Sequence, residues 1–277
     1  MLDFTGKKGV VFGVANDRSI AWHISKVLLD QGAEIGFTHL PDRPDDERKK
    51  SRGRVEKAIG GHPGAKFLVP CNVQDDAQIA EVFAGAKETF GTIDFLIHAI
   101  AYANLEDLKV STMECSRDGF KLAMEISAFS LLAVANGARE VLADNASIVT
   151  LTYLGGEKCV PGYNVMGVCK SALDACTRYL AFDLGLRGIR CNAISAGPLK
   201  TLASSAVGAK GMEELYAEIS PLGRNITHSE VGNVGAFLLH PASSGITGEI
   251  LHVDAGYSIM GTPGRLLDKF QDASKSG

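Results

Sequence analysis

Short apolar runs alternate with longer segments of helical periodicity along this chain of 277 residues. The runs that predict strands are KGVVFGV (8–14), AEIGFTHL (33–40), AKFLVPCNV (65–73), TIDFLIHAIAY (92–102), ASIVTLTY (146–153), IRCNAISA (189–196) and GEILHVDAG (248–256). Several are apolar on consecutive residues, as in strands that helices cover on both faces. The pattern predicts a single doubly wound α/β domain over residues 1–277, with a seven-stranded, mostly parallel sheet.

The segment SIAWHISKVLLDQG predicts the first crossover helix. Its apolar residues recur at steps of three and four from Ile20, and Gly32 is placed to end it. Two segments resist regular assignment, a charged one over 41–57 and a small-residue one over 197–225, and a short flexible tail is expected over 270–277.

Composition excludes some classes of function. The chain is 45% hydrophobic and 22% charged with a net charge of −4, so no overall basic field would recruit nucleic acid. No window approaches the roughly 18 apolar residues of a membrane span, and no charged-then-apolar leader precedes the first strand. The six cysteines include no C-x-x-C pair, which favours a reducing, cytoplasmic compartment.

A glycine turn follows the first predicted strand, leaving it at Gly13 and reaching the helix at Ser19 and Ile20. Unpaired N–H groups at a helix start bind phosphate, and glycine lets a dinucleotide approach the backbone. The usual three-glycine fingerprint is absent. Two interpretations stay open: the dinucleotide-binding turn of a Rossmann-type fold, or a plain tight turn with Ser19 capping the helix.

The ends of the second and third predicted strands carry the next candidates. A dinucleotide fold usually places an acid at the second strand's end for the adenosine ribose, or a base for a 2′-phosphate. This chain has His39 and Leu40 there, and its first basic residue, Arg43, follows Pro41. Asn72 closes the third strand, where its side chain either holds the adenine edge or forms a turn.

Tyr163 and Lys170 are separated by six residues, so on one helix they lie about 20° apart, two turns along the same face. Their polar groups can then meet one ligand. A phenol has a pKa near 10 and a neighbouring ammonium favours the phenolate, so we expect Lys170 to lower the pKa of Tyr163. The lysine can also hold ribose hydroxyls. A Tyr and a Lys on a solvated helix face would show the same spacing.

After a strand-turn-helix nucleotide site, Tyr-x6-Lys resembles the short-chain dehydrogenase/reductase superfamily. Within it the chain resembles the bacterial enoyl-acyl carrier protein reductases, from about Phe4 to Met260. The matching stretches are Gly-x5-Ser-Ile-Ala at 13–21, HAIAYA at 98–103, TYLGGE at 152–157, YNVMGVCK at 163–170 and NAISAGPLKTLA at 192–203. In that family the usual serine near the catalytic tyrosine is missing, and a second tyrosine stands ten residues before it, as Tyr153 does here.

The resemblance implies reduction of trans-2-enoyl-acyl carrier protein at the C2–C3 double bond with NADH, in the last step of each fatty acid elongation cycle. It implies that Tyr163 donates to the enolate oxygen, that Lys170 fixes the nicotinamide ribose, and that Tyr153 lies beside the acyl chain. It also implies a homotetramer without a metal, and Ala103 at the substrate entrance. The implied cofactor-binding residues are Gly13, Ser19, Ile20, Leu40, Asn72, Val73, Ile100, Lys170, Pro198, Leu199 and Thr201.

Two departures from the family concern the cofactor and the carrier. Leu40 gives a 2′-phosphate no hydrogen-bond partner, which favours NADH over NADPH unless the basic insert after Pro41 reaches back. Glu213 and Glu214 stand beside a single Lys210, where the family tends to be basic toward its acidic carrier protein.

The segment from Thr201 to Ser220 is expected to form a lid over the cofactor and the acyl chain. Small residues dominate TLASSAVGAKG, and the following helix pattern is expected to build one apolar wall from Met212, Leu215, Tyr216 and Ile219. An ordinary surface helix is the alternative.

Two other functions fit parts of the pattern. A β-ketoacyl or other carbonyl reductase would use the same Tyr163 and Lys170 but needs an upstream hydroxyl to polarise the ketone, and Thr150 stands near that position. A non-catalytic NAD-binding sensor would keep the fold but has no need of a proton donor.

Overall fold

The computed structural model describes residues 2–42, 49–199 and 212–267. Within these ranges one sheet has the strand order β3-β2-β1-β4-β5-β6-β7, and each pairing is parallel. The strands are β1 (Lys8–Phe12), β2 (Glu34–His39), β3 (Ala65–Pro70), β4 (Ile93–His98), β5 (Leu142–Thr152), β6 (Arg190–Ala196) and β7 (Ile250–Val253). All seven predicted strands are confirmed, although β4 ends at His98, before the predicted end at residue 102.

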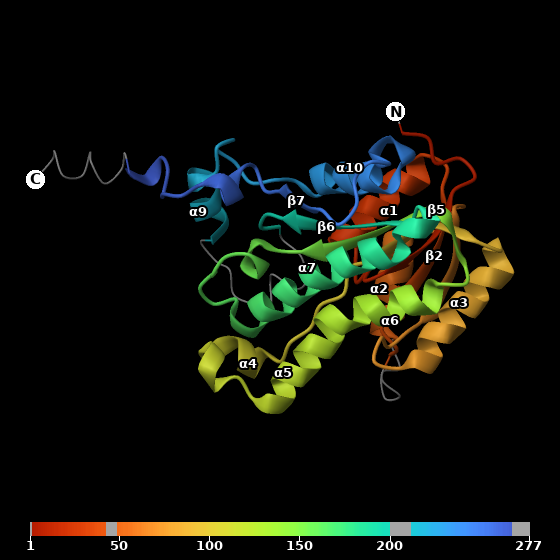
Figure 1. The fold of residues 1–277 in the computed structure, drawn as a ribbon, viewed down its shortest axis with the longest axis horizontal. Helices are drawn as coiled ribbons and strands as arrows, with labels where there is room; N and C mark the ends of the chain where they lie inside the picture. Colours follow the sequence, from red (N-terminus) through yellow and green to blue (C-terminus); the bar gives the residue numbers. More distant parts are fainter. Residues whose placement is uncertain (1, 43–48, 200–211, 268–277) are drawn as a thin grey trace, which may run out of the picture.

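Helices cover both faces of the sheet (Figure 1). Helices α1, α2 and α10 pack on one face, and α3, α6 and α7 pack on the other. The helices are α1 (Ile20–Asp30), α2 (Lys50–Ile59), α3 (Asp76–Phe90), α4 (Leu105–Lys109), α5 (Arg117–Met124), α6 (Ser130–Ala138), α7 (Asn164–Leu184), α9 (Met212–Ile219) and α10 (His228–Leu239). A π-helical turn, Glu125–Phe129, joins α5 to α6.

Successive residues of β1 point into two different cores. Val10 and Phe12 are fully buried among the residues of α3 and α6, whereas Val11 is fully buried among those of α1 and α10. Side chains alternate across a strand, so a strand that helices cover on both sides must be apolar at every position. This explains why the predicted strands are continuous apolar runs.

The parallel strands bring one set of predicted site residues to a single edge. The strand order reverses beside β1, which has β2 and β3 on one side and β4 to β7 on the other. Open parallel sheets bind ligands outside the carboxyl ends of their strands, at such a switch point. The residues that follow strand ends here are Gly13, Leu40, Asn72, Ile100, Tyr153 and Leu199.

Some expectations concern segments outside the described ranges. These are the predicted tail over 270–277, Arg43 in the charged insert, Thr201 and Lys210, and the first half of the predicted lid. The one-domain boundary of 1–277 therefore stays a prediction. Among the described helices, none is both long and apolar enough to cross a membrane.

Candidate active site

The turn after β1 is built by Gly13 and Ser19. Gly13 has φ +103°, and a Cβ there would collide with the carbonyl oxygen of Ala99, so the position requires glycine. Ser19 precedes α1, but its side chain does not cap the helix. Its Oγ instead accepts hydrogen bonds from the backbone N–H groups of Ala15 (2.9 Å) and Asn16 (3.1 Å). The helix-capping alternative is thus wrong, and the hydroxyl hydrogen of Ser19 can still donate to a phosphate.

The end of β2 presents a buried nitrogen. His39 is 6% exposed, and its Nδ1 lies 2.9 Å from the carbonyl oxygen of Leu40, so Nδ1 carries the hydrogen and donates it. Its Nε2 is buried and has no hydrogen-bond partner among the described residues. Nε2 is therefore open to a ligand at the place where dinucleotide folds hold the adenosine ribose. Leu40 itself is mostly exposed.

Asn72 forms a turn at the end of β3. Its Oδ1 accepts a hydrogen bond from the backbone N–H of Gln74 at 3.2 Å, and its own backbone N–H donates to Gln78. The turn interpretation is therefore confirmed for the side-chain oxygen. The side-chain NH₂ group is the part that can meet an adenine edge, and that contact stays a prediction. Val73 is buried in the core on the α3 side.

Tyr163 does not belong to the helix on which it was expected. Helix α7 starts at Asn164, which has φ +43°, and Tyr163 is the residue before it. The Asn164 side chain donates to the carbonyl oxygens of Leu108 (2.9 Å) and Val110 (2.5 Å). Tyr163 therefore occupies the N-cap position of α7 rather than its first turn, and the meeting of its hydroxyl and the Lys170 ammonium at one ligand stays a prediction. The chain after β4 is instead tied to the start of α7, beside the tyrosine.

Lys170 lies one and a half turns into α7 and is 5% exposed. Its Nζ donates to the carbonyl oxygen of Leu151 at 2.7 Å, near the end of β5. Burial lowers the pKa of Lys170 to about 8, although Asp174 partly opposes the shift. An ammonium has three hydrogens, so two remain for ribose hydroxyls after the bond to Leu151.

The prediction that Lys170 lowers the pKa of Tyr163 is wrong. Burial raises the pKa of this phenol, and the nearby Tyr153, Cys169 and Asp174 raise it further. A phenolate would lose its hydration here, while the Lys170 ammonium is directed at a backbone carbonyl. Tyr163 therefore stays protonated at neutral pH, which leaves it a hydrogen-bond donor.

Tyr153 and Tyr163 are brought together edge to face. Their ring centroids are 4.8 Å apart at an interplanar angle of 67°. Gly155 permits this approach, because a Cβ there would collide with the Tyr163 ring. The Tyr153 hydroxyl lies 2.5 Å from the hydroxyl of Tyr216 on α9. The structure thus assembles Tyr153, Tyr163 and Lys170 around the end of β5.

Asp174 is a buried acid beside this group that sequence reasoning missed. It follows Lys170 by one helical turn and is 3% exposed, and its Oδ1 has no hydrogen-bond partner among the described residues. Burial raises the pKa of Asp174, and the Lys170 charge opposes that shift. Its spacing from Lys170 was a visible signal, but an i, i+4 acid and base are also common on exposed helices.

The loop after β4 carries Ile100 and Ala103 and is fixed by Ser127. The Ser127 Oγ accepts from the backbone N–H of Tyr102 at 2.9 Å and donates to its carbonyl oxygen at 3.0 Å. Ser127 is fully buried in the π-helical turn, a conformation found often at functional sites. Nothing in the sequence marks a π-helix, so this residue was not predicted.

The Thr150 hydroxyl is hydrogen-bonded to the buried His98. His98 is fully buried between Thr150 and Ser130, with Nδ1 3.0 Å from the Thr150 hydroxyl and Nε2 2.8 Å from the Ser130 hydroxyl. Ser130 donates its own hydrogen to the carbonyl oxygen of Ile126, so it accepts from Nε2–H, and Thr150 must donate to Nδ1. Burial lowers the pKa of His98 to about 3, which keeps it neutral. The Thr150 hydrogen is therefore not available to a substrate ketone.

The remaining predicted cofactor residues flank this edge. Pro198 and Leu199 follow β6, and Leu199 is buried against the core on the α1 side. Ile20 opens α1 and is partly buried. Their cofactor contacts stay predictions. Within the described ranges, no group of three or more His, Cys, Asp or Glu side chains is placed to hold a metal.

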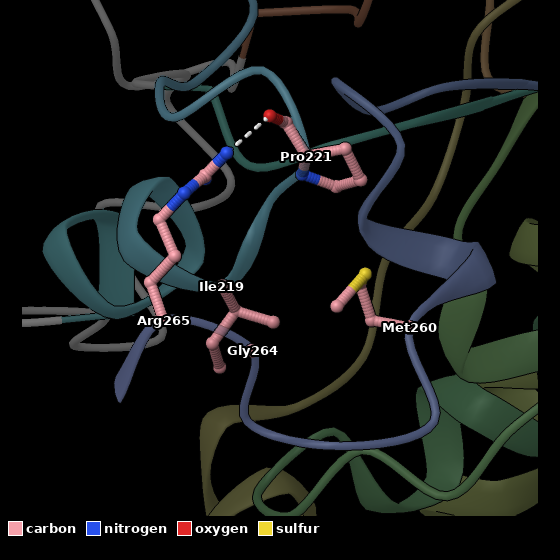
Figure 2. A pocket seen from close by; sticks show the side chains of 5 residues that line it. All are labelled: Ile219, Pro221, Met260, Gly264 and Arg265. Atoms are coloured by element: carbon pink, nitrogen blue, oxygen red, sulfur yellow. Dashed lines mark hydrogen bonds between the residues drawn. The ribbon is translucent and has the colours of Figure 1, made fainter. Parts of the chain in front are cut away.

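A pocket lies at the end of α9. It is lined by Ile219 at the end of α9, Pro221, Met260, Gly264 and Arg265 (Figure 2). Arg265 donates to the carbonyl oxygens of Ser220 and Pro221, both at 2.9 Å, so the chain after β7 is fastened to the end of α9. Its guanidinium is committed to the fold rather than to the cavity.

The fold and site define a dinucleotide-dependent reductase, and comparison with known proteins narrows this class. The family model described as Enoyl-(Acyl carrier protein) reductase matches residues 13–258. An NADH-dependent enoyl-acyl-carrier-protein reductase from Nostoc sp. is 48% identical over 262 residues, which are 94% of this chain and 100% of that protein. This chain belongs to the enoyl-(acyl carrier protein) reductase family.

Solved structures agree with this assignment. The Bacillus cereus enoyl-acyl carrier protein reductase, solved with NADP+ and indole naphthyridinone, has a TM-score of 0.88 at 45% identity, over 95% of this chain and 100% of that one. The Anaplasma phagocytophilum reductase, solved with NAD, has a TM-score of 0.86 at 42% identity, over 95% and 98%.

Proposed function

We propose that this chain reduces the C2–C3 double bond of trans-2-enoyl-acyl carrier protein thioesters with NADH, in the last step of each fatty acid elongation cycle. The observation that carries the proposal is the meeting of a protonated Tyr163, Tyr153 and Lys170 at the carboxyl edge of the sheet. The family resemblance of nearly the whole chain supports it.

The residues present fit the cofactor. The Gly13 turn and the start of α1 would hold the pyrophosphate, the two spare hydrogens of Lys170 would hold the nicotinamide ribose, and Nε2 of His39 would contact the adenosine ribose. The exposed Leu40 gives a 2′-phosphate no hydrogen-bond partner, which favours NADH over NADPH.

The chain's own residues would stabilise the charge that reduction creates. When bound, NADH would supply a hydride to the β-carbon, and negative charge would then develop on the thioester oxygen. Tyr163 donates a hydrogen bond to that oxygen, where its neutral, buried phenol needs no reorganisation. Protonation of the α-carbon then completes the saturated thioester.

The site does not support the two rival functions, ketone reduction and non-catalytic sensing. A ketone reductase would need a hydroxyl at the Thr150 position, but that hydrogen is donated to His98. A sensor would have no use for a buried proton donor beside Lys170.

One assay tests the reaction. Crotonyl-coenzyme A and acetoacetyl-coenzyme A are compared, each with NADH and with NADPH, by following loss of cofactor absorbance. We expect faster turnover of the enoyl thioester and a preference for NADH. Faster turnover of the ketone would overturn the proposal.

The acyl carrier protein partner and a cytoplasmic location belong to the same proposal. All six cysteines are free thiols, as a reducing compartment requires. The carrier would approach from the side of Ala103, at the tip of the loop that Ser127 fixes. Lys210, the basic residue in the segment expected to meet the acidic carrier, lies outside the described ranges.

We propose that the chain assembles as a homotetramer through the outer face of α7. Tyr179 and Phe182 are 71% and 82% exposed there, and Val168 is also exposed at helical spacing from them. Phe129 extends the apolar surface on the adjoining π-helical turn. Contiguous exposed apolar surface of this kind marks an interface.

Phe182→Glu is expected to shift the protein to smaller species in sedimentation velocity, because it places a charge on that surface. Met113→Glu is the control, since Met113 is also highly exposed but lies on the segment between α4 and α5. An unchanged oligomer in Phe182→Glu would place the interface elsewhere.

A further inference from the structure

Tyr216 is a buried phenol that lies outside the recognised motifs. It is 2% exposed, and its hydroxyl lies 2.5 Å from that of Tyr153. The sequence predicted it as part of an apolar wall with Leu215. Leu215 is 38% exposed and so lies off the buried face, and Tyr216 points a polar group at the site.

Several described elements hold Tyr216 in place. Its ring stacks on Tyr257 with centroids 3.9 Å apart and an interplanar angle of 19°. Its carbonyl oxygen accepts from the Ser220 hydroxyl at 2.6 Å, and Arg265 fastens the carbonyls of Ser220 and Pro221 (Figure 2). The hydroxyl of Tyr216 is thus positioned by the end of α9 and the chain after β7, before any ligand binds.

Burial raises the pKa of both phenols. Both hydroxyls therefore keep their hydrogen at neutral pH, and one of them donates to the other. When Tyr216 is the donor, the hydrogen of Tyr153 is left to point toward Tyr163 and the substrate.

We propose that Tyr216 is a positioning residue for enoyl reduction: by donating to Tyr153, it fixes that ring and directs the Tyr153 hydroxyl hydrogen onto the thioester oxygen beside Tyr163. An accepted hydrogen bond also polarises the O–H bond that Tyr153 donates, so the second donor is strengthened as charge develops. This inference rests on the proposed function, and it gives Tyr153 a defined part in it.

The test is Tyr216→Phe, which keeps the ring stack on Tyr257 and removes only the hydroxyl. A neutral hydrogen bond contributes about 1 kcal/mol, so kcat with crotonyl-coenzyme A is expected to fall about fivefold to tenfold. The KM for NADH should not change, because the Tyr216 hydroxyl is bonded to Tyr153, which is not among the proposed cofactor residues. Ser244→Ala, which removes an exposed hydroxyl from the turn after α10, is the control and should match the wild type.

A double-mutant cycle separates positioning from a general loss of packing. In the Tyr153→Phe background, adding Tyr216→Phe should cause no further fall in kcat, since the bond is already gone. An equal further fall there, or wild-type kcat in Tyr216→Phe, would overturn the inference. If the wild type itself fails to reduce crotonyl-coenzyme A, the proposed function fails instead, so the two failures are distinct.

Discussion

Tyr163→Phe is expected to lower kcat for enoyl thioester reduction by about 10²-fold to 10³-fold, the usual cost of removing one donor from a developing oxyanion. The phenyl ring of the variant would remain against Tyr153, since the edge-to-face contact uses no hydroxyl. Cofactor affinity should be nearly unchanged, because the hydroxyl is assigned to the enolate oxygen and not to the dinucleotide. Steady-state kinetics with crotonyl-coenzyme A and NADH measure both effects.

The pH dependence adds a second check on Tyr163. Burial raises its pKa above the ordinary phenol value, so the wild-type kcat should show no decline near pH 10 from ionisation of this residue. Ser244→Ala again serves as the control for removing a hydroxyl at a distance. Wild-type kcat in Tyr163→Phe would remove Tyr163 from the mechanism.

The sheet was predictable from the sequence because its strands are buried on both faces. Residues such as Val10, Val11 and Phe12 are all apolar, and no other element of a soluble α/β domain produces such short continuous runs between helices. Strand ends were less predictable, and the apolar run of β4 continues past His98 into the loop that holds Ile100.

The candidate site was predictable only in its residue types. The spacing of Tyr153, Tyr163 and Lys170 was visible, but the positive φ of Asn164 moves Tyr163 out of α7. The raised pKa of Tyr163 depends on burial, which is a tertiary property that no local pattern reports. Tyr216 was predicted only as part of an apolar wall, and its polar contact was missed, because its hydroxyl meets Tyr153 only in the folded chain.

Lys170→Ala is expected to raise the KM for NADH by about tenfold or more and to lower kcat as well. Hydrogen bonds from a charged donor contribute about 1.5–3 kcal/mol, and in the proposed function the Lys170 ammonium, held by the carbonyl oxygen of Leu151, would give two of them to the nicotinamide ribose. Misplacing the ribose also misplaces the hydride, so both constants should change. Fluorescence titration with NADH measures the binding term separately from turnover.

NADH binding by the wild type should depend on pH because of the same ammonium. The pKa of Lys170 is lowered to about 8, so the ammonium is present below that pH and is lost above it, and NADH should bind more weakly as pH rises through that value. The dependence should vanish in Lys170→Ala. The unfolded lysine keeps its ordinary pKa of 10.5, so the buried ammonium costs stability below pH 8, and this cost disappears as pH rises from about 8 to 10.5.

A variant at Asp174 is the control that separates loss of NADH binding from the effect of a buried acid on stability. Removing the Lys170 ammonium takes away one of the two positive charges that favour ionisation of the buried Asp174 carboxyl, the other being Arg178. Part of the loss in Lys170→Ala then comes from the acid. The double variant Lys170→Ala/Asp174→Asn removes the acid as well. We expect it to recover thermal stability without recovering NADH affinity, because no group replaces the ribose donors. NADH affinity equal to the wild type in either variant would contradict the ribose role of Lys170.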